Sequence, residues 1–182
     1  FMHRAPGYEE LLEKGFSGIA ADCIHRKAQT KDPEKLRFYD GLICCCHSMK
    51  RLGERFSEEA LALLEKLPET ADSFSRRNLH RIANTCRRVP WQPPETFFEA
   101  IQTLMFCYEV FSALDGIEVN TYGMIDRLLE PYYRKDLEAG RISKEEAYSL
   151  LSMFLYITDG QYSGRESEEQ ETACTVMLGG QD

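Results

Sequence analysis

The sequence has no apolar run of the roughly 18 residues that a membrane-spanning helix requires, and no secretory leader opens it. Its cysteines also lack the even number and regular spacing that a disulfide framework shows. The seven are Cys23, Cys44, Cys45, Cys46, Cys86, Cys107 and Cys174. We therefore expect no membrane partner and a reducing, cytoplasmic location.

Positive charge is also in short supply. With 22 Lys and Arg against 30 Asp and Glu, the formal net charge is −8 at pH 7. Such a chain repels a polyphosphate backbone, and its arginine-rich stretch RRNLHRIANTCRR has no interleaved aromatic rings on which bases could stack. The sequence therefore predicts no nucleic-acid partner.

What is present is an ordinary globular composition. The 182 residues are 43% hydrophobic and 29% charged, and their number fits one domain. The sequence opens on Phe1 and closes on LGGQD, an apparent turn. We expect residues 1–182 to be a single partial domain, with both ends continuing in a longer chain.

Apolar residues recur at helical spacing along most of the sequence. The predicted helices cover 8–23, 33–52, 74–88, 97–111 and 145–157. The first is broken mildly by Gly15 and Gly18, and the second either continues or restarts at Ser57 and ends at Pro68. The last two open on the capping-box sequences TFFE and SKEE and are apolar nearly all round, so we expect both to be buried. Residues 171–180 are β-branched and end in two glycines, which predicts a strand.

Three consecutive cysteines stand directly before His47. Adjacent residues of a helix diverge by about 100°, so Cys44, Cys45 and Cys46 cannot all face one ion. Because only Cys46 follows the apolar stripe, packing is our main interpretation of these thiols. We interpret His47 as an exposed or hydrogen-bonded helix residue. Metal ligation and redox chemistry are the alternatives.

Short catalytic motifs are not found elsewhere in the sequence. It has no zinc spacing, phosphate loop, nucleophile elbow or paired carboxylates. The carboxylates Asp22, Glu118, Asp126 and Asp159 are available as acids or bases, but composition alone does not rank them.

Longer stretches resemble the glycyl radical enzymes. RIANTCRRVPWQPPETFFEAIQTLMFCYEV is similar to the family's helix–loop–helix, in which an arginine-valine-proline loop leads through PP-x-T-F-x-E-A-x-Q into a buried helix. HRAPGYEELLEKGFSGI, FYDGLICCCHSMKRLGERF, YGMIDRLLEPYYRKDLEAGRISKEEAYSLL and TVMLGGQD resemble further family segments in the same order. The resemblance covers almost the whole chain. It favours the dehydratase, C–N lyase and decarboxylase branch over pyruvate formate-lyase itself.

The resemblance implies a barrel of two five-stranded halves wrapped in helices. This mainly α segment would supply helices of that α/β barrel and about one to two short barrel strands near the C-terminus. In the family, an activating enzyme that uses S-adenosylmethionine and an iron–sulfur cluster installs a glycyl radical. The radical oxidises a loop cysteine, whose thiyl takes a hydrogen atom from the substrate.

The loops that carry this chemistry do not match any part of the chain. The sequence contains neither R-V-x-G-Y nor the family's cysteine loop, so we expect both beyond Asp182. The ICCC stretch aligns instead with a family helix that small or apolar residues usually fill. We therefore expect no catalytic residue, metal ligand or cofactor in this segment.

The resemblance also points to substrate-binding residues. Several dehydratases carry a histidine at the position of His3, near the barrel mouth. The run IEVNTYGMID stands where many relatives have N-G-H-S-x-S, and the place of its substrate-binding serine falls on Val119 or Thr121. The expected substrate-binding residues are thus His3, Asn120, Thr121 and Tyr122. A frayed terminal histidine and simple turn packing or helix capping are the alternatives.

Two departures bear on the substrate. Gly123 is not followed by arginine, and Arg127 replaces the usual glutamine. The substrate of a named relative is therefore not transferred to this chain.

These observations lead to one main hypothesis. The chain is the N-terminal-middle portion of a glycyl radical enzyme of anaerobic metabolism, and this portion is inactive alone. The whole enzyme would dehydrate a small organic substrate, cleave its C–N or C–C bond, or decarboxylate it. Its partners would be that substrate, the activating enzyme, the remainder of the parent chain and, in a homodimer, a second copy. A stand-alone helical interaction or scaffold domain derived from the same fold is the alternative, and a Cys/His metal protein is a third possibility.

Overall fold

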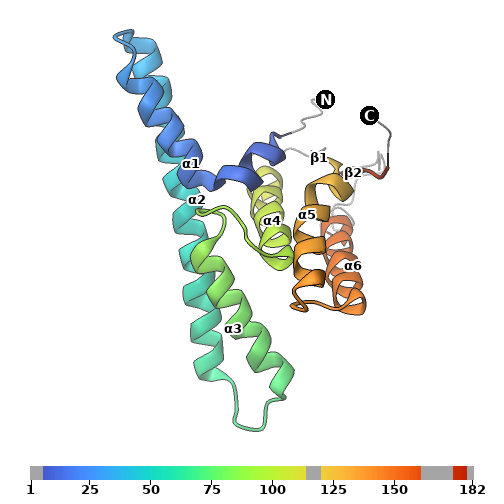
Figure 1. Ribbon diagram of the computed structural model, residues 1–182. Coiled ribbons are helices and arrows are strands. Elements are labelled where there is room, and N and C mark those ends of the chain that lie inside the picture. Colours follow the sequence, from blue (N-terminus) through green and yellow to red (C-terminus); the bar gives the residue numbers. More distant parts are fainter. Residues whose placement is uncertain (1–5, 114–119, 161–173, 180–182) are drawn as a thin grey trace, which may run out of the picture. The chain divides into compact units, whose positions relative to one another are not determined.

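The computed structural model describes residues 6–113, 120–160 and 174–179 (Figure 1). In chain order the elements are α1 (Tyr8–Ala28), α2 (Pro33–Lys66), α3 (Ser73–Arg88), α4 (Phe97–Ala113), β1 (Asn120–Met124), α5 (Ile125–Glu138), α6 (Lys144–Gly160) and β2 (Cys174–Met177). The chain divides into two compact units. We call Glu10–Pro94 the helical unit, and Phe1–Glu9 with Glu95–Asp182 the strand-bearing unit. The mainly α prediction is confirmed, whereas the single partial domain stays a prediction.

The helical unit is built on α2, which α3 follows back along its second half (Figure 1). The Asp32 side chain caps α2 by accepting from the Glu34 amide at 2.9 Å. The helix does not restart at Ser57, whose buried hydroxyl donates to the Ala83 carbonyl of α3 at 2.7 Å. The sequence left open whether the helix continues or restarts at Ser57, and the structure shows that α2 is one uninterrupted helix.

Gly15 breaks α1 more sharply than its sequence pattern predicts. Its φ of 63° and ψ of 174° are not helical. The amides of Phe16 and Ser17 donate to the carbonyls of Pro90 and Trp91, at 3.1 and 2.8 Å. A Cβ at Gly15 would lie 2.6 Å from the Trp91 oxygen. Glycine is required here both by the left-handed backbone and by the close approach of the loop after α3.

The triple cysteine lies inside α2, as expected. Cys46 is 4% exposed, and Cys44 and Cys45 are exposed to solvent, which confirms packing as the role of Cys46. His47 stacks on Trp91, with ring centroids 5.1 Å apart. None of the described helices is both long and apolar enough to cross a membrane.

The strand-bearing unit contains α4, which is buried as predicted. Its first turn is fixed from two directions. The Thr96 hydroxyl accepts from the Glu99 amide at 3.2 Å, as in the expected capping box. The Phe97 amide donates to the Asp136 carboxylate of α5, a side chain that is 3% exposed, at 2.8 Å. The reciprocal half of the box differs, because the Glu99 carboxylate accepts from the Glu95 amide.

Two strands pair in parallel within this unit. Asn120 aligns with Cys174 and Met124 with Met177, and the register shifts between Thr121 and Gly123. The helices α5 and α6 lie between β1 and β2 in sequence, as a parallel connection requires. The strand expected within 171–180 is confirmed as β2. The helix α5 was not predicted.

The described residues bury only one side of α6, and burial of its other side stays a prediction. Ala147 and Phe154 face the core, with exposures of 5% and 2%. Tyr156 lies on the opposite face and is 74% exposed, while Tyr148, which lies between the two faces, is 75% exposed. Apolar residues on nearly every side of α6 predict burial all round, but the described elements cover only one side of the helix.

Candidate functional site

The structure places the predicted substrate-binding residues unevenly. His3 lies outside the described residues. Asn120 begins β1, where its backbone pairs with β2. Thr121 is half-buried, and its hydroxyl accepts from the Gly123 amide at 3.1 Å. This bond closes a short side-chain turn at the shift in strand register, so the hydroxyl already has a local role.

Tyr122 points into the core of the strand-bearing unit. It is 1% exposed, and its ring centroid lies 5.0 Å from that of Phe154, 5.6 Å from Tyr8 and 5.8 Å from Tyr108. The Tyr108 hydroxyl in turn donates to the Thr158 carbonyl at 2.9 Å. Rings at these separations are in favourable contact. This aromatic cluster joins β1 to α4, α6 and the first turn of α1.

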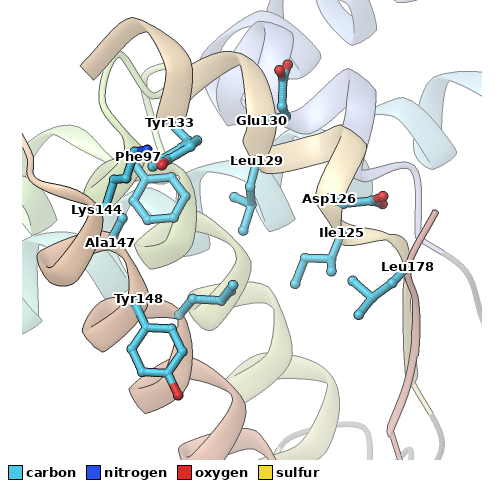
Figure 2. A pocket seen from close by; sticks show the side chains of 11 residues that line it. Phe97, Ile125, Asp126, Leu129, Glu130, Tyr133, Lys144, Ala147, Tyr148 and Leu178 are labelled. Carbon is cyan, nitrogen blue, oxygen red and sulfur yellow. The ribbon is translucent and has the colours of Figure 1, made fainter. Parts of the chain in front are cut away.

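A groove of about 350 Å³ opens between α5 and α6 (Figure 2). Its lining is mainly apolar, and Leu178, just after β2, contributes at one end of it. The charged side chains in the lining are Asp126, Glu130 and Lys144. A mainly apolar lining with a few charged groups is the usual composition of a small-molecule pocket, but Asn120, Thr121 and Tyr122 do not line this groove.

Asp126 lies in the first turn of α5 and reaches the chain that follows β2. Its Oδ2 accepts from the Gly179 amide at 2.8 Å. This hydrogen bond holds the pKa of the Asp126 carboxyl below its usual range. Its Oδ1 is buried and has no hydrogen-bond partner among the described residues. The sequence offers Asp126 only as one of four unranked carboxylates, because neither β1 nor α5, which place it, was predicted.

The thiols of the helices are not arranged for metal or thiolate chemistry. Burial raises the pKa of Cys46 to about 11 and those of Cys86 and Cys107 to about 12, so these thiols stay protonated near neutral pH. The described residues contain no group of three or more His, Cys, Asp or Glu side chains that could hold a metal ion.

Comparison with known proteins identifies the family. The family model described as pyruvate formate lyase-like matches residues 2–182. The chain belongs to the pyruvate formate lyase-like family. The resemblance drawn from its sequence is thereby confirmed.

Individual members of the pyruvate formate lyase-like family support the same conclusion. Trans-4-hydroxy-L-proline dehydratase of Clostridioides difficile is 31% identical over 159 residues, which are 81% of this chain and 20% of that protein. Indoleacetate decarboxylase of Tractidigestivibacter scatoligenes is 32% identical, over 97% of this chain and 21% of that protein. The chain thus spans about a fifth of the length of these curated relatives.

A solved structure also matches the fold. The crystal structure of a glycyl radical enzyme from Archaeoglobus fulgidus superposes with a TM-score of 0.79 at 27% identity, over 96% of this chain and 21% of that one. The predicted fold class, a helical segment of a glycyl radical enzyme barrel, is confirmed.

Proposed function

We propose that these residues are a wall segment of a glycyl radical enzyme that dehydrates, cleaves or decarboxylates a small organic substrate. The observation that carries the proposal is the family match over residues 2–182. It is supported by relatives whose names denote a dehydratase and a decarboxylase. The segment supplies structure and substrate-side residues and is inactive alone.

In this proposal the substrate-binding residues are His3, Asn120, Thr121 and Tyr122. Support comes from β1, which carries three of them and pairs in parallel with β2. Tyr122 contributes indirectly, because its buried ring anchors β1 in the aromatic cluster. Thr121 is the more suitable contact, since its side chain is only half-buried.

The residues of this chain do not fit the radical-bearing role. Its thiols Cys46, Cys86 and Cys107 lie within helices and are buried, and no stretch of the sequence matches the family's glycine loop. No step of the radical reaction is therefore assigned to these residues. In the proposal, both catalytic loops belong to other parts of the polypeptide, and a separate activating enzyme installs the radical.

Other parts of the same polypeptide are the proposed partners of the exposed apolar surfaces. The relatives are about five times as long as the matched segment, and α6 exposes Tyr148, Met153 and Tyr156. Covering such a surface is favourable at about 25 cal/mol per Å² of apolar area. The proposed setting is the cytoplasm of a cell with anaerobic metabolism.

Reading the gene that encodes these residues is the first test. We expect its frame to continue into a cysteine loop and then into a glycine loop of the R-V-x-G-Y type. A reading frame that ends without either loop would refute the proposal that the protein is a glycyl radical enzyme. If the protein encoded by such a short reading frame is monodisperse and unfolds cooperatively, the alternative of a scaffold domain is favoured.

A further inference from the structure

The strands β1 and β2 end side by side. Met124 and Met177 are paired in the parallel register, and they are the last residues of their strands. Asp126 follows two residues after the first strand end, and Gly179 two residues after the second. In parallel α/β sheets, the segments that leave the carboxyl ends of neighbouring strands are those that form ligand sites.

One hydrogen bond joins these two segments. Asp126 Oδ2 accepts from the Gly179 amide at 2.8 Å, across 53 positions of sequence. A carboxylate acceptor makes this bond stronger than one between neutral groups. The position of Asp126 in the first turn of α5 favours its negative charge further, because the free amides of a helix start carry positive partial charge.

The turn after β2 has little else to hold it among the described residues. Leu178 is 74% exposed, and Gly179 has a φ of 75°, a left-handed conformation that only glycine adopts readily. A Cβ at Gly179 would meet no atom within 4 Å. The turn is therefore fixed by its backbone hydrogen bond to Asp126 rather than by side-chain packing.

We propose that Asp126 is a positioning residue, whose carboxylate ties the chain leaving β2 to the start of α5 and so sets the direction of the segment that follows Gly179. This role rests on the proposed function, in which the residues of this chain form a wall segment of the enzyme. Asp126 does not touch the reacting atoms. It acts through the turn that it holds.

Hydrogen exchange on the full-length protein tests the tie directly. Asp126→Ala removes the acceptor, and we expect exchange of the Gly179 amide to become at least about tenfold faster. Asp126→Asn keeps an acceptor oxygen without the charge, so its exchange rate should fall between those of Asp126→Ala and the unchanged protein. Glu138→Gln is the matched control, because Glu138 is an exposed carboxylate on the same helix and does not line the groove. The control should leave Gly179 unchanged.

Steady-state kinetics of the activated enzyme supply the second measurement. We expect Asp126→Ala to lower kcat/KM at least about tenfold and Asp126→Asn to recover most of that loss, while Glu138→Gln stays at the level of the unsubstituted enzyme. Unaltered Gly179 exchange in Asp126→Ala would overturn the proposal, and so would faster exchange with unaltered kcat/KM. If the unsubstituted enzyme is activated but turns over no substrate, the proposed function is contradicted. The hydrogen-exchange comparison would still decide whether Asp126 holds the Gly179 turn.

Discussion

Gly15 shows how a single residue can be fixed by both its backbone and its neighbours. We predict that Gly15→Ala lowers the free energy of unfolding by about 2 to 4 kcal/mol, because its left-handed φ strains an L-residue and its Cβ would lie 2.6 Å from the Trp91 oxygen. Urea unfolding followed by circular dichroism measures the change. Gly41→Ala is the control. Its Cβ would meet nothing within 4 Å inside α2, so it should stabilise by about 0.5 to 1 kcal/mol. A neutral Gly15→Ala would contradict the close approach.

The cysteines of α2 should differ in reactivity. Cys44 and Cys45 are exposed, whereas burial raises the pKa of Cys46 to about 11. At pH 8 we expect iodoacetamide to label the first two and to spare Cys46, since the thiolate is the reactive form. Labelling of Cys46 should rise as the pH approaches 11 or when the chain unfolds. Peptide mass spectrometry reads each site, and equal labelling of all three in the folded protein at pH 8 would contradict the structure.

Residue roles were predictable where they followed from periodicity alone. Helical spacing alone predicted that Cys46 is buried. The tie from Asp126 to Gly179 did not, because it joins residues 53 positions apart and nothing local marks which carboxylate will meet which amide.

At the scale of elements, the contact between α2 and α3 depends on a buried hydrogen bond. We predict that Ser57→Ala costs about 1 kcal/mol of unfolding free energy, because it removes the hydroxyl that donates to the Ala83 carbonyl at 2.7 Å. Urea unfolding gives the value. Ser48→Ala is the matched control on the same helix. Its exposed hydroxyl bonds only within α2, so the change should stay within about 0.5 kcal/mol. Equal effects of the two changes would argue against the buried bond.

The helices were predicted well, but two elements show the limits of pattern reading. No helix over 125–138 was predicted from the sequence, although the apolar spacing at Ile125, Leu128 and Leu129 is helical, and α5 contains Pro131 in its interior. Its tertiary contacts outweigh the local cost of proline. For α6, an apolar surface on every side predicted burial, but sequence alone does not show which elements are present to cover each side.

At the scale of the whole molecule, family and fold were recoverable from the sequence because long motifs recur in order. The substrate was not, since residues that choose a substrate are few and, in the proposed enzyme, depend on loops outside this chain. Met124, which follows Gly123 in place of arginine, and Arg127 depart from the family pattern close in sequence to the proposed contacts of β1. In the proposal they are where specificity should depart from that of the relatives.

Electron paramagnetic resonance of the full-length polypeptide tests the central claim most directly. We expect anaerobic incubation with its activating enzyme and S-adenosylmethionine to give a doublet from a glycine-centred radical. The α-hydrogen causes that splitting, so growth on α-deuterated glycine should collapse it. No such signal, in a reaction where the activating enzyme cleaves S-adenosylmethionine, would contradict the assignment to a glycyl radical enzyme.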